Sequence, residues 1–589
     1  MNAVYAVLER VLLRSTFLKY SERSATPFFA RRLNRARVVW INEKWFAELG
    51  IDVSNCDCLR CIDDFLLDHY GFAVPRPEDG DDSFGDERKV FFADHYGDIG
   101  MVAHGGSGRA GTLGRIQVKG IGITPLVANN ANWVHAHGCA WMEEAIREAL
   151  YSELVDAEFP AGSLPIIAII DTGLHAEMPK GHLGERRALI LRDTEMRVAH
   201  LLRAAFFRPG EHCNYAQADD VGRVADAIAF YGGNFVRPSD GVSHLSPSTL
   251  LHSVAESIAV SEMFRLTTGG INPSSVTLSG RLLDFGSARA LPDWRRAELY
   301  VNSQRFGTDS GAWARNISHI AYLLTKHGYP ADANELRSLF DRSYSAAMKK
   351  YCLAYFGLAS VNVKEEHAAD LVASLAAIFN SQQKRHTSYV DGSPFDGDWI
   401  YGDLSRMLQG LEPDGRYSGR LCRIRDVIAQ ISLSAPNPYW FVRRCLFIGL
   451  RHSCPRALLY RETLQMALFE SVAPKKPSDS LRPGAINDVL SHCLTAGRRH
   501  ISFLNDEHIV ALRDNGTTSI FKVETTPGSF SVYVSACVLS GRVRLGETLI
   551  SIRDLDGSGN ETEGRWLGSL TNEIVHELKI DLMPAAWAT

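Results

Sequence analysis

The chain lacks a hydrophobic run long enough to cross a membrane. Its longest apolar stretch, around Leu164 to Ile170, has the length of a buried strand, well short of the roughly 20 residues that a membrane-spanning helix needs. An excess of positive charge is also missing, because 63 Lys and Arg stand against 68 Asp and Glu, a net charge of −5. We therefore expect no membrane span and no nucleic acid as the main partner.

Cysteine is sparse. The 11 cysteines are an odd number and mostly scattered, which is typical of reduced thiols rather than of a disulfide framework. The exception is the group Cys56, Cys58 and Cys61, which could hold zinc with a fourth ligand from elsewhere, although no second CxxC accompanies it. Charged residues interrupt the apolar start of the chain, so a secretory signal is not expected and the predicted location is the cytoplasm.

What the chain does contain is an acidic tripeptide, Asp284-Phe285-Gly286, at the end of a predicted hairpin. Two short apolar runs, Val276–Leu278 and Leu282–Leu283, are separated by Ser279-Gly280 and follow a polar turn that begins at Asn272. Protein-kinase-like folds hold Mg²⁺ against nucleotide phosphates with a carboxylate just past a strand, where a glycine lets the chain turn away. The tripeptide also arises by chance, so its weight depends on what lies upstream.

A glycine-rich loop and a lysine precede this motif. Gly106, Gly108 and Gly111 form a G-x-G-x-x-G pattern. In a dinucleotide-binding domain such a loop opens a helix. Here residues 115–120 alternate between polar and apolar and then break at a glycine, which predicts a strand that carries Lys119. The order of glycine loop, strand and lysine is typical of protein kinases, where the lysine places a positive charge on the phosphates.

A helix is predicted next, from about Trp141 to Glu153. Small residues occupy one side of it, and Glu144 and Glu148 share another. Glu148 is the expected partner that orients Lys119. Each feature alone is also typical of a glycine-rich surface turn or of a helix with solvated carboxylates, but the three in this order favour a nucleotide site.

These segments resemble the selenoprotein O family. The similarity rests on Gln117–Pro125, Ile146–Glu153 and Asn272–Gly286, and it extends in patches over residues 25–412. Members of that family are kinase-fold proteins that bind ATP in a flipped orientation and transfer AMP to protein hydroxyls. The resemblance implies an α+β, bilobal protein-kinase-like fold, with a strand-rich N-lobe and a helical C-lobe, and it implies ATP and Mg²⁺ as cofactors.

The resemblance also implies roles for particular residues. Lys119 would bind phosphate with Glu148 as its ion-pair partner, and Asp284 would be the principal metal ligand. Arg192 and Arg197 match two arginines that clamp the outer phosphates, although their spacing here is two residues shorter. The implied nucleotide-binding residues are Gly106, Gly108, Arg109, Lys119, Gly120, Gly138, Arg192 and Arg197. The implied catalytic residues are Lys119, Glu148, Arg197 and Asp284.

Other positions depart from the family pattern. Nine and ten residues before the metal aspartate, the family carries Asn, a second metal ligand, and Asp, the presumed general base; this chain has Ser275 and Ser274 there. A serine hydroxyl ligates Mg²⁺ weakly, so Ser275 and nearby Asn272 remain candidate ligands, but Ser274 cannot accept a proton at neutral pH. Only Gly138 remains of an acidic-Gly-Arg element that helps to orient the family's nucleotide, which leaves the orientation of ATP open.

The missing base leaves three functions open. A carboxylate acceptor is already ionised and needs no base, so the favoured function is AMP transfer to a peptide or protein carboxylate. Relatives of selenoprotein O that mature siderophore-carrying microcins act in this way with a small acyltransferase-like partner subunit, and this chain looks closer to that branch. The first alternative is a hydroxyl-directed protein adenylyltransferase or kinase. The second is a pseudokinase scaffold that binds nucleotide and a partner without catalysis.

Composition predicts four segments. Residues 1–85 form an N-terminal segment that closes in an acidic loop, and residues 86–200 form the nucleotide-binding N-lobe. Residues 201–474 form a helical C-lobe with the metal loop, and residues 475–589 form a small β-rich accessory domain. A docking surface and structural padding are equally compatible with that last domain. Its predicted strands include Ile520–Glu524, Phe530–Val534 and Thr548–Ile552.

Overall fold

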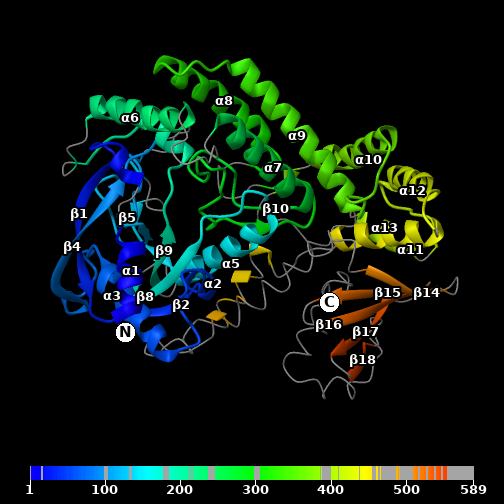
Figure 1. The fold of residues 1–589 in the computed structure, drawn as a ribbon, viewed down its shortest axis with the longest axis horizontal. Helices are drawn as coiled ribbons and strands as arrows, with labels where there is room; N and C mark the ends of the chain where they lie inside the picture. The colour runs from blue at the N-terminus through cyan, green and yellow to red at the C-terminus, as the bar shows by residue number, and fades with distance from the viewer. Residues whose placement is uncertain are drawn as a thin grey trace.

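The computed structural model is a mixed α/β protein with one large antiparallel sheet beside a set of packed helices (Figure 1). It describes residues 2–453 with short internal gaps, residues 459–461, 464–465, 468, 486–487 and 490, and five strands between 509 and 552. The internal gaps are residues 15–16, 98–103, 132–135, 177–184, 211–212, 214–215, 237–245, 298–304, 385, 388–399, 409 and 437.

Nine strands form the large sheet, in the order β2-β8-β9-β6-β5-β4-β1-β3, with β7 paired to β9. Because β1 pairs with β4 along most of its length, the sheet does not divide at residue 85, where the sequence suggested the end of an N-terminal segment. The strands are β1 Ala25–Leu33, β2 Arg37–Ile41, β3 Phe72–Ala73, β4 Phe84–Asp94, β5 Ala110–Leu113, β6 Ile116–Lys119, β7 Ala140–Trp141, β8 Ile166–Ala176 and β9 Glu185–Asp193.

The central strands are apolar on both sides because both faces of the sheet are covered. In β9, Ala188 and Ile190 join the core that reaches into the helical part, and Leu189 and Leu191 join the core under the N-terminal helices. Alternate side chains of a strand point to opposite faces, so a strand buried on both reads as a continuous apolar run. This explains the run around Leu164 to Ile170, which was predicted as a buried strand and contributes to β8.

Helices α1 (Asn2–Leu12), α2 (Glu43–Glu48) and α3 (Cys56–Tyr70) lie in the N-terminal part, with two 3₁₀ turns, η1 (Phe17–Tyr20) and η2 (Asp81–Ser83). Helix α3 carries the cysteines considered for zinc. Cys56 is exposed, Cys58 is half-buried and Cys61 is buried, because residues two and five positions apart point to different sides of a helix. Among the described residues, no three metal-binding side chains lie close enough to hold an ion, so the zinc hypothesis is wrong for this part of the chain.

Helix α5 (Met142–Glu158) joins the sheet to the helical part. It confirms the helix predicted from about Trp141 and continues five residues past Glu153. Most of its residues are buried, and the core cluster that contains its buried apolar residues also contains buried residues of α7 (Pro247–Phe264). In Figure 1, α5 lies at the junction between the large sheet and the helices. A site carried by α5 therefore faces both parts.

The helical part begins after the turn η3 (Val198–Leu201). No described helix is long and apolar enough to cross a membrane. Besides α7, its helices are α6 Gln217–Val236, α8 Asp309–Lys326, α9 Ala333–Tyr355, α10 Glu365–Gln383, α11 Ile400–Leu408, α12 Ser418–Ser432 and α13 Pro438–Ser453. Its short strands are β10 Leu266–Thr267, β11 Arg289–Ala290, β12 Arg296–Ala297 and β13 His386–Thr387.

The last described segment is a five-stranded antiparallel meander, in which each strand pairs with the next. Its strands include the three predicted alternating runs, so the prediction of a β-rich segment is confirmed. The strands are β14 Ile509–Asp514, β15 Thr518–Thr525, β16 Gly528–Ser535, β17 Leu539–Leu545 and β18 Thr548–Ile552.

Candidate functional site

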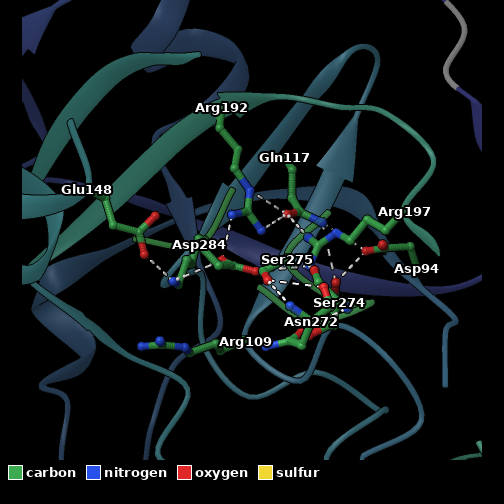
Figure 2. A network of polar contacts seen from close by, with 12 residues as sticks. Asp94, Arg109, Gln117, Glu148, Arg192, Arg197, Asn272, Ser274, Ser275 and Asp284 are labelled. Carbon is green, nitrogen blue, oxygen red and sulfur yellow. Dashed lines mark hydrogen bonds and ion pairs between the residues drawn. The ribbon is translucent and has the colours of Figure 1, made fainter. Parts of the chain in front are cut away.

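The predicted site residues come together where β6, β9, α5 and the loop before Asp284 meet (Figure 2). Strand β6 ends at Lys119, and its pairing with β9 places Gln117 directly opposite Arg192. Facing residues of an antiparallel pair project to the same side of the sheet, and so do residues two apart on one strand. Gln117, Lys119 and Arg192 therefore share the face that Glu148 of α5 and Asp284 approach.

The expected ion pair between Lys119 and Glu148 is present. The Lys119 Nζ atom also lies 3.3 Å from an oxygen of Glu144 and 3.3 Å from Asp284 Oδ1. Burial alone would lower the pKa of Lys119, but the surrounding carboxylates, Glu148 foremost, outweigh it and raise the pKa above its ordinary value. The lysine is therefore a fixed positive charge in a buried position.

Asp284 is the centre of the cluster. Its Oδ1 lies 2.6 Å from Arg192 Nη1 and its Oδ2 lies 3.0 Å from Arg197 Nη1, so with Lys119 it faces three cations. Burial would raise the pKa of this carboxyl, but the charges of Arg192, Lys119 and Arg197 outweigh it and hold the pKa well below its usual range. The carboxylate is ionised at any physiological pH.

The backbone of Asp284 is strained. Its φ is +66°, in the left-handed region that residues other than glycine rarely adopt. The strand-like contact between Val276 and Leu282 brings the chain to this point, which agrees with the predicted hairpin. Left-handed residues of this kind cost about 1–3 kcal/mol and gather at ligand-binding and catalytic sites. Because three cations hold the side chain, the surrounding structure supports this conformation.

Gln117 aligns the two arginines, a role that was not predicted. Its Oε1 atom accepts hydrogen bonds from Arg192 Nε at 2.8 Å and from Arg197 Nη2 at 3.0 Å. Its Nε2 atom donates to Asp94 Oδ1 at 2.9 Å. Lys119 stands two residues further along the same strand, so the alternation of strand side chains was the available signal. One buried amide thus holds the two guanidinium groups of the cluster in a common orientation.

Asp94 and His200 extend the hydrogen-bond network around Gln117 and Arg197. Asp94 also accepts a hydrogen bond from Ser107, which lies between Gly106 and Gly108 in the glycine loop. His200 Nε2 lies 3.3 Å from Asp94 Oδ2, and its Nδ1 accepts from the Arg197 backbone N–H at 2.9 Å. Burial lowers the pKa of His200, and the hydrogen bond to Asp94 offsets part of that effect. The network links the glycine loop to the arginines.

Replacing Gln117 with leucine should disrupt this alignment. We expect a stability loss of about 1–3 kcal/mol, because Asp94 and both arginines lose a buried partner, together with weaker binding of nucleotide or tripolyphosphate. Gln382→Leu is the matched control, since Gln382 is also a buried glutamine that accepts a backbone hydrogen bond, from Trp294. Denaturant unfolding and titration calorimetry would measure both effects. Equal phosphate affinity in the two variants would contradict the role of Gln117.

Arg109 has a partner that was not predicted. Its guanidinium donates to both oxygens of Glu144, at 2.7 and 3.0 Å, and to the Cys139 carbonyl at 2.8 Å. Glu144 is one helical turn before Glu148 and shares its face of α5. Burial would raise the pKa of Glu144, but Arg109 and Lys119 outweigh it and lower the pKa to about 2. Arg109 is thus tied to α5 beside the predicted Gly138 element.

The predicted glycines shape the backbone around the cluster. Gly106 and Gly108 lie in the loop between β4 and β5, while Gly120 and Gly138 lie between β6 and β7. Gly120 has a φ of +90°, and a Cβ there would lie 2.5 Å from a carbonyl oxygen of β9. Gly138 has a φ of +74°, and a Cβ there would lie 2.4 Å from the Ile123 nitrogen. Backbone packing explains these two glycines, and contact with a nucleotide stays a prediction.

Two serines stand where the resemblance implied a base and a second metal ligand, and both are engaged within their own loop. Ser274 Oγ donates to Asn272 Oδ1 at 2.6 Å. Ser275 Oγ lies 3.0 Å from the Gly270 carbonyl, to which it donates, and it accepts from the Asn272 N–H at 3.1 Å. These bonds stabilise the turn rather than activate either hydroxyl. A metal-ligand role for Ser275 or Asn272 stays a prediction and would require this loop to rearrange.

Helix α8 anchors the same loop. Asp309 Oδ1 accepts from the Ile271 N–H at 2.9 Å, and Trp313 Nε1 donates to the Ile271 carbonyl at 2.7 Å. Asp309 and Trp313 are both buried, so the position of this loop is set by the helical part. Neither contact could be predicted from spacing, because α8 lies almost 40 residues further along the chain.

Stability should depend on pH through Glu262 of α7. Burial raises the pKa of Glu262 to about 8, and Asp309 adds to the rise, against a hydrogen bond from Tyr344 that lowers it. The folded state therefore keeps a proton that the unfolded state loses near pH 4.3, so this group's contribution to stability falls from about pH 4 to about pH 8. The melting temperature of the Glu262→Gln variant should fall less over that pH range than that of the unmodified protein. Parallel curves of melting temperature against pH would contradict the prediction.

Comparison with known proteins adds no assignment: no protein-family model matches the chain, and a search of the curated proteins finds no match. The geometry of the cluster around Asp284 therefore carries the functional interpretation.

Proposed function

We propose that this protein has a bilobal, protein-kinase-like architecture and catalyses ATP- and Mg²⁺-dependent nucleotidyl transfer. One observation carries the proposal: an ionised, backbone-strained Asp284 faces Lys119, Arg192 and Arg197, and Glu148 anchors the lysine from a helix. Strongly perturbed ionisable groups gathered at the junction of two parts of a fold are typical of active sites. The sheet would be the N-lobe, and α6 to α13 would be the C-lobe.

The residues fit Mg²⁺ and a triphosphate. Mg²⁺ is usually held by one or two carboxylates together with substrate phosphates and water, which matches the single carboxylate of Asp284. Arginine forks bind two phosphate oxygens at once, and lysine acts as a point charge. When bound, the metal ion would neutralise charge that develops on the phosphates. Lys119, Arg192 and Arg197 would orient the phosphate chain, and Glu148 would keep Lys119 in place.

The acceptor that the site favours is a peptide or protein carboxylate. Residues 266–275 contain no Asp or Glu, and the Ser274 hydroxyl donates its proton to Asn272, so the loop offers no general base. A carboxylate needs none: one of its oxygens would bond to the α-phosphorus of ATP while the bond to the β-phosphate bridging oxygen breaks. The products would be an acyl-adenylate and pyrophosphate, with no proton transfer.

Such a reaction implies a further enzyme. An acyl-adenylate is consumed by a nucleophile, so a small acyltransferase-like subunit would complete peptide maturation. The β14–β18 meander is the candidate surface for recruiting the peptide or that subunit. A silent scaffold is the second candidate function, because both serines in the position of the family's catalytic residues are engaged inside their loop.

ATP labelled at the α- or γ-phosphate, with Mg²⁺, candidate peptides and hydroxylamine as a trap, would test the proposal. Pyrophosphate release and hydroxamate formation that disappear in Asp284→Asn would support carboxylate adenylation. The matched control is Asp293→Asn, since Asp293 is buried and ion-paired, with Arg295, outside the cluster. Stable α-label on a hydroxyl would indicate the hydroxyl-directed enzyme, and γ-label a kinase. Absence of any turnover that depends on Asp284 would favour the scaffold.

A further inference from the structure

Cationic side chains of the protein itself surround the carboxylate proposed to hold a metal ion. Both oxygens of Asp284 are in contact with cations: Oδ1 with Arg192 and Lys119, and Oδ2 with Arg197. A Mg²⁺ ion would lie about 2.1 Å from a ligating oxygen. It would therefore sit next to three like charges, and it would compete with them for the same two oxygens.

Each of the three cations also has a partner other than Asp284. Gln117 holds both arginines, and Arg197 also donates to the Ser274 carbonyl at 3.0 Å. Glu148 holds Lys119. If the carboxylate turned away, these cations would remain in place as a preformed anion site, because their other partners belong to the scaffold.

Accessibility points in the same direction. The side chains of Lys119, Arg192 and Arg197 are only 3–8% exposed, whereas that of Asp284 is 29% exposed. An incoming ligand would therefore reach Asp284 before the three cations. Displacing its carboxylate would leave the three cationic groups available to bind the ligand. An anion with several oxygens matches two guanidinium groups and an ammonium group better than one carboxylate does.

We propose that this cluster binds a di- or triphosphate group before it binds metal, and that Asp284 becomes a metal ligand only after phosphate oxygens replace it on Arg192, Arg197 and Lys119. The inference rests on the proposed function for the role of Asp284 as a metal ligand. It adds an order of binding, in which the polyphosphate unmasks the metal site. Free Mg²⁺ would then not occupy the site of the resting protein.

Inorganic tripolyphosphate and Mn²⁺ are suitable probes, because neither requires turnover. We expect tripolyphosphate to bind the full chain in EDTA by titration calorimetry, and we expect no Asp284-dependent Mn²⁺ binding to the phosphate-free protein by electron paramagnetic resonance. Asp284→Asn should strengthen metal-free tripolyphosphate binding about tenfold, since a competitor for the cations is lost, and it should remove the extra affinity that Mg²⁺ provides. Asp293→Asn should change neither affinity.

Arg192→Gln gives the converse test. It should weaken metal-free tripolyphosphate binding about tenfold and make Mn²⁺ binding to the phosphate-free protein detectable. Arg423→Gln is the control, because Arg423 of the unmodified protein pairs with Asp370 on the helical part, away from the cluster.

Two results on the unmodified protein would overturn the proposal whether or not the variants fold: absence of tripolyphosphate binding in EDTA, or Mn²⁺ binding to the phosphate-free protein that tripolyphosphate does not enhance. Weaker metal-free binding in a folded Asp284→Asn variant would also overturn it. These measurements are separate from the proposed chemistry. A protein that binds in the expected order but transfers no AMP would retain this inference and lose the proposed function.

Discussion

Replacing Asp284 with asparagine is expected to abolish nucleotide-dependent turnover while the protein remains folded. Asparagine keeps the shape of the side chain but removes the charge that would hold Mg²⁺ in the proposed function, so we expect a rate loss of at least about 100-fold. Single-turnover assays with α-labelled ATP would measure it. More than about a tenth of the original rate would show that Asp284 is not at the reacting centre.

The same substitution should change stability in a way that reveals the ion cluster. Lys119, Arg192 and Arg197 lose their shared carboxylate, and their mutual repulsion should cost about 2–3 kcal/mol, somewhat less than a fully buried ion pair, because asparagine still accepts hydrogen bonds. Tripolyphosphate should restore most of that stability, since binding to the folded state alone stabilises it. Thermal unfolding with and without tripolyphosphate would check this, with Asp293→Asn as control.

The second large effect is expected for Lys119→Met. Glu148 is fully buried, and its Oε2 has no hydrogen-bond partner among the described residues, so removing the lysine leaves a carboxylate with little compensation. Removing one partner of a buried pair typically costs roughly 3–5 kcal/mol. We expect unfolding by denaturant to show a loss of that size, together with loss of nucleotide binding.

A double variant separates stability from function. Lys119→Met combined with Glu148→Gln removes the uncompensated charge, so most of the lost stability should return while nucleotide binding stays absent. If the stability loss of the double variant equals the sum of the losses of the two single variants, the two residues do not interact. The ion pair would then have no role in placing α5. Recovery of binding in the double variant would contradict the phosphate-binding role of Lys119.

The cluster as a whole carries balanced charge. Arg109, Lys119, Arg192 and Arg197 stand against Asp94, Glu144, Glu148 and Asp284. Six of these charges are buried, and those of Arg109 and Asp284 are half-buried. Burying charges is costly, and apolar residues of the same volume often stabilise a fold at least as well. Such a cluster is more easily explained by a requirement to exchange partners with a charged ligand than by a requirement for stability.

Local patterns in the sequence were sufficient for the elements that carry the site. The alternation of residues 115–120 predicted β6, and the small residues on one side of the segment after Trp141, with glutamates on another, predicted α5. Short alternating runs predicted strands in the C-terminal segment as well. These signals are local, because strand alternation and helical periodicity depend only on neighbouring residues. The pairing of Lys119 with Glu148 was predicted because a strand that ends in a lysine is followed by a helix that carries glutamates, which is the order found in protein kinases.

The contacts that define the site are not local. The sequence by itself determined which residues carry charge and which elements present them, since side-chain chemistry and periodicity are properties of the chain. Only the tertiary structure decided that Gln117 holds Arg192 and Arg197 together, that Arg109 pairs with Glu144, and that Asp309 anchors the loop at Ile271. These partners come from different elements, and long-range packing alone sets the distances between them.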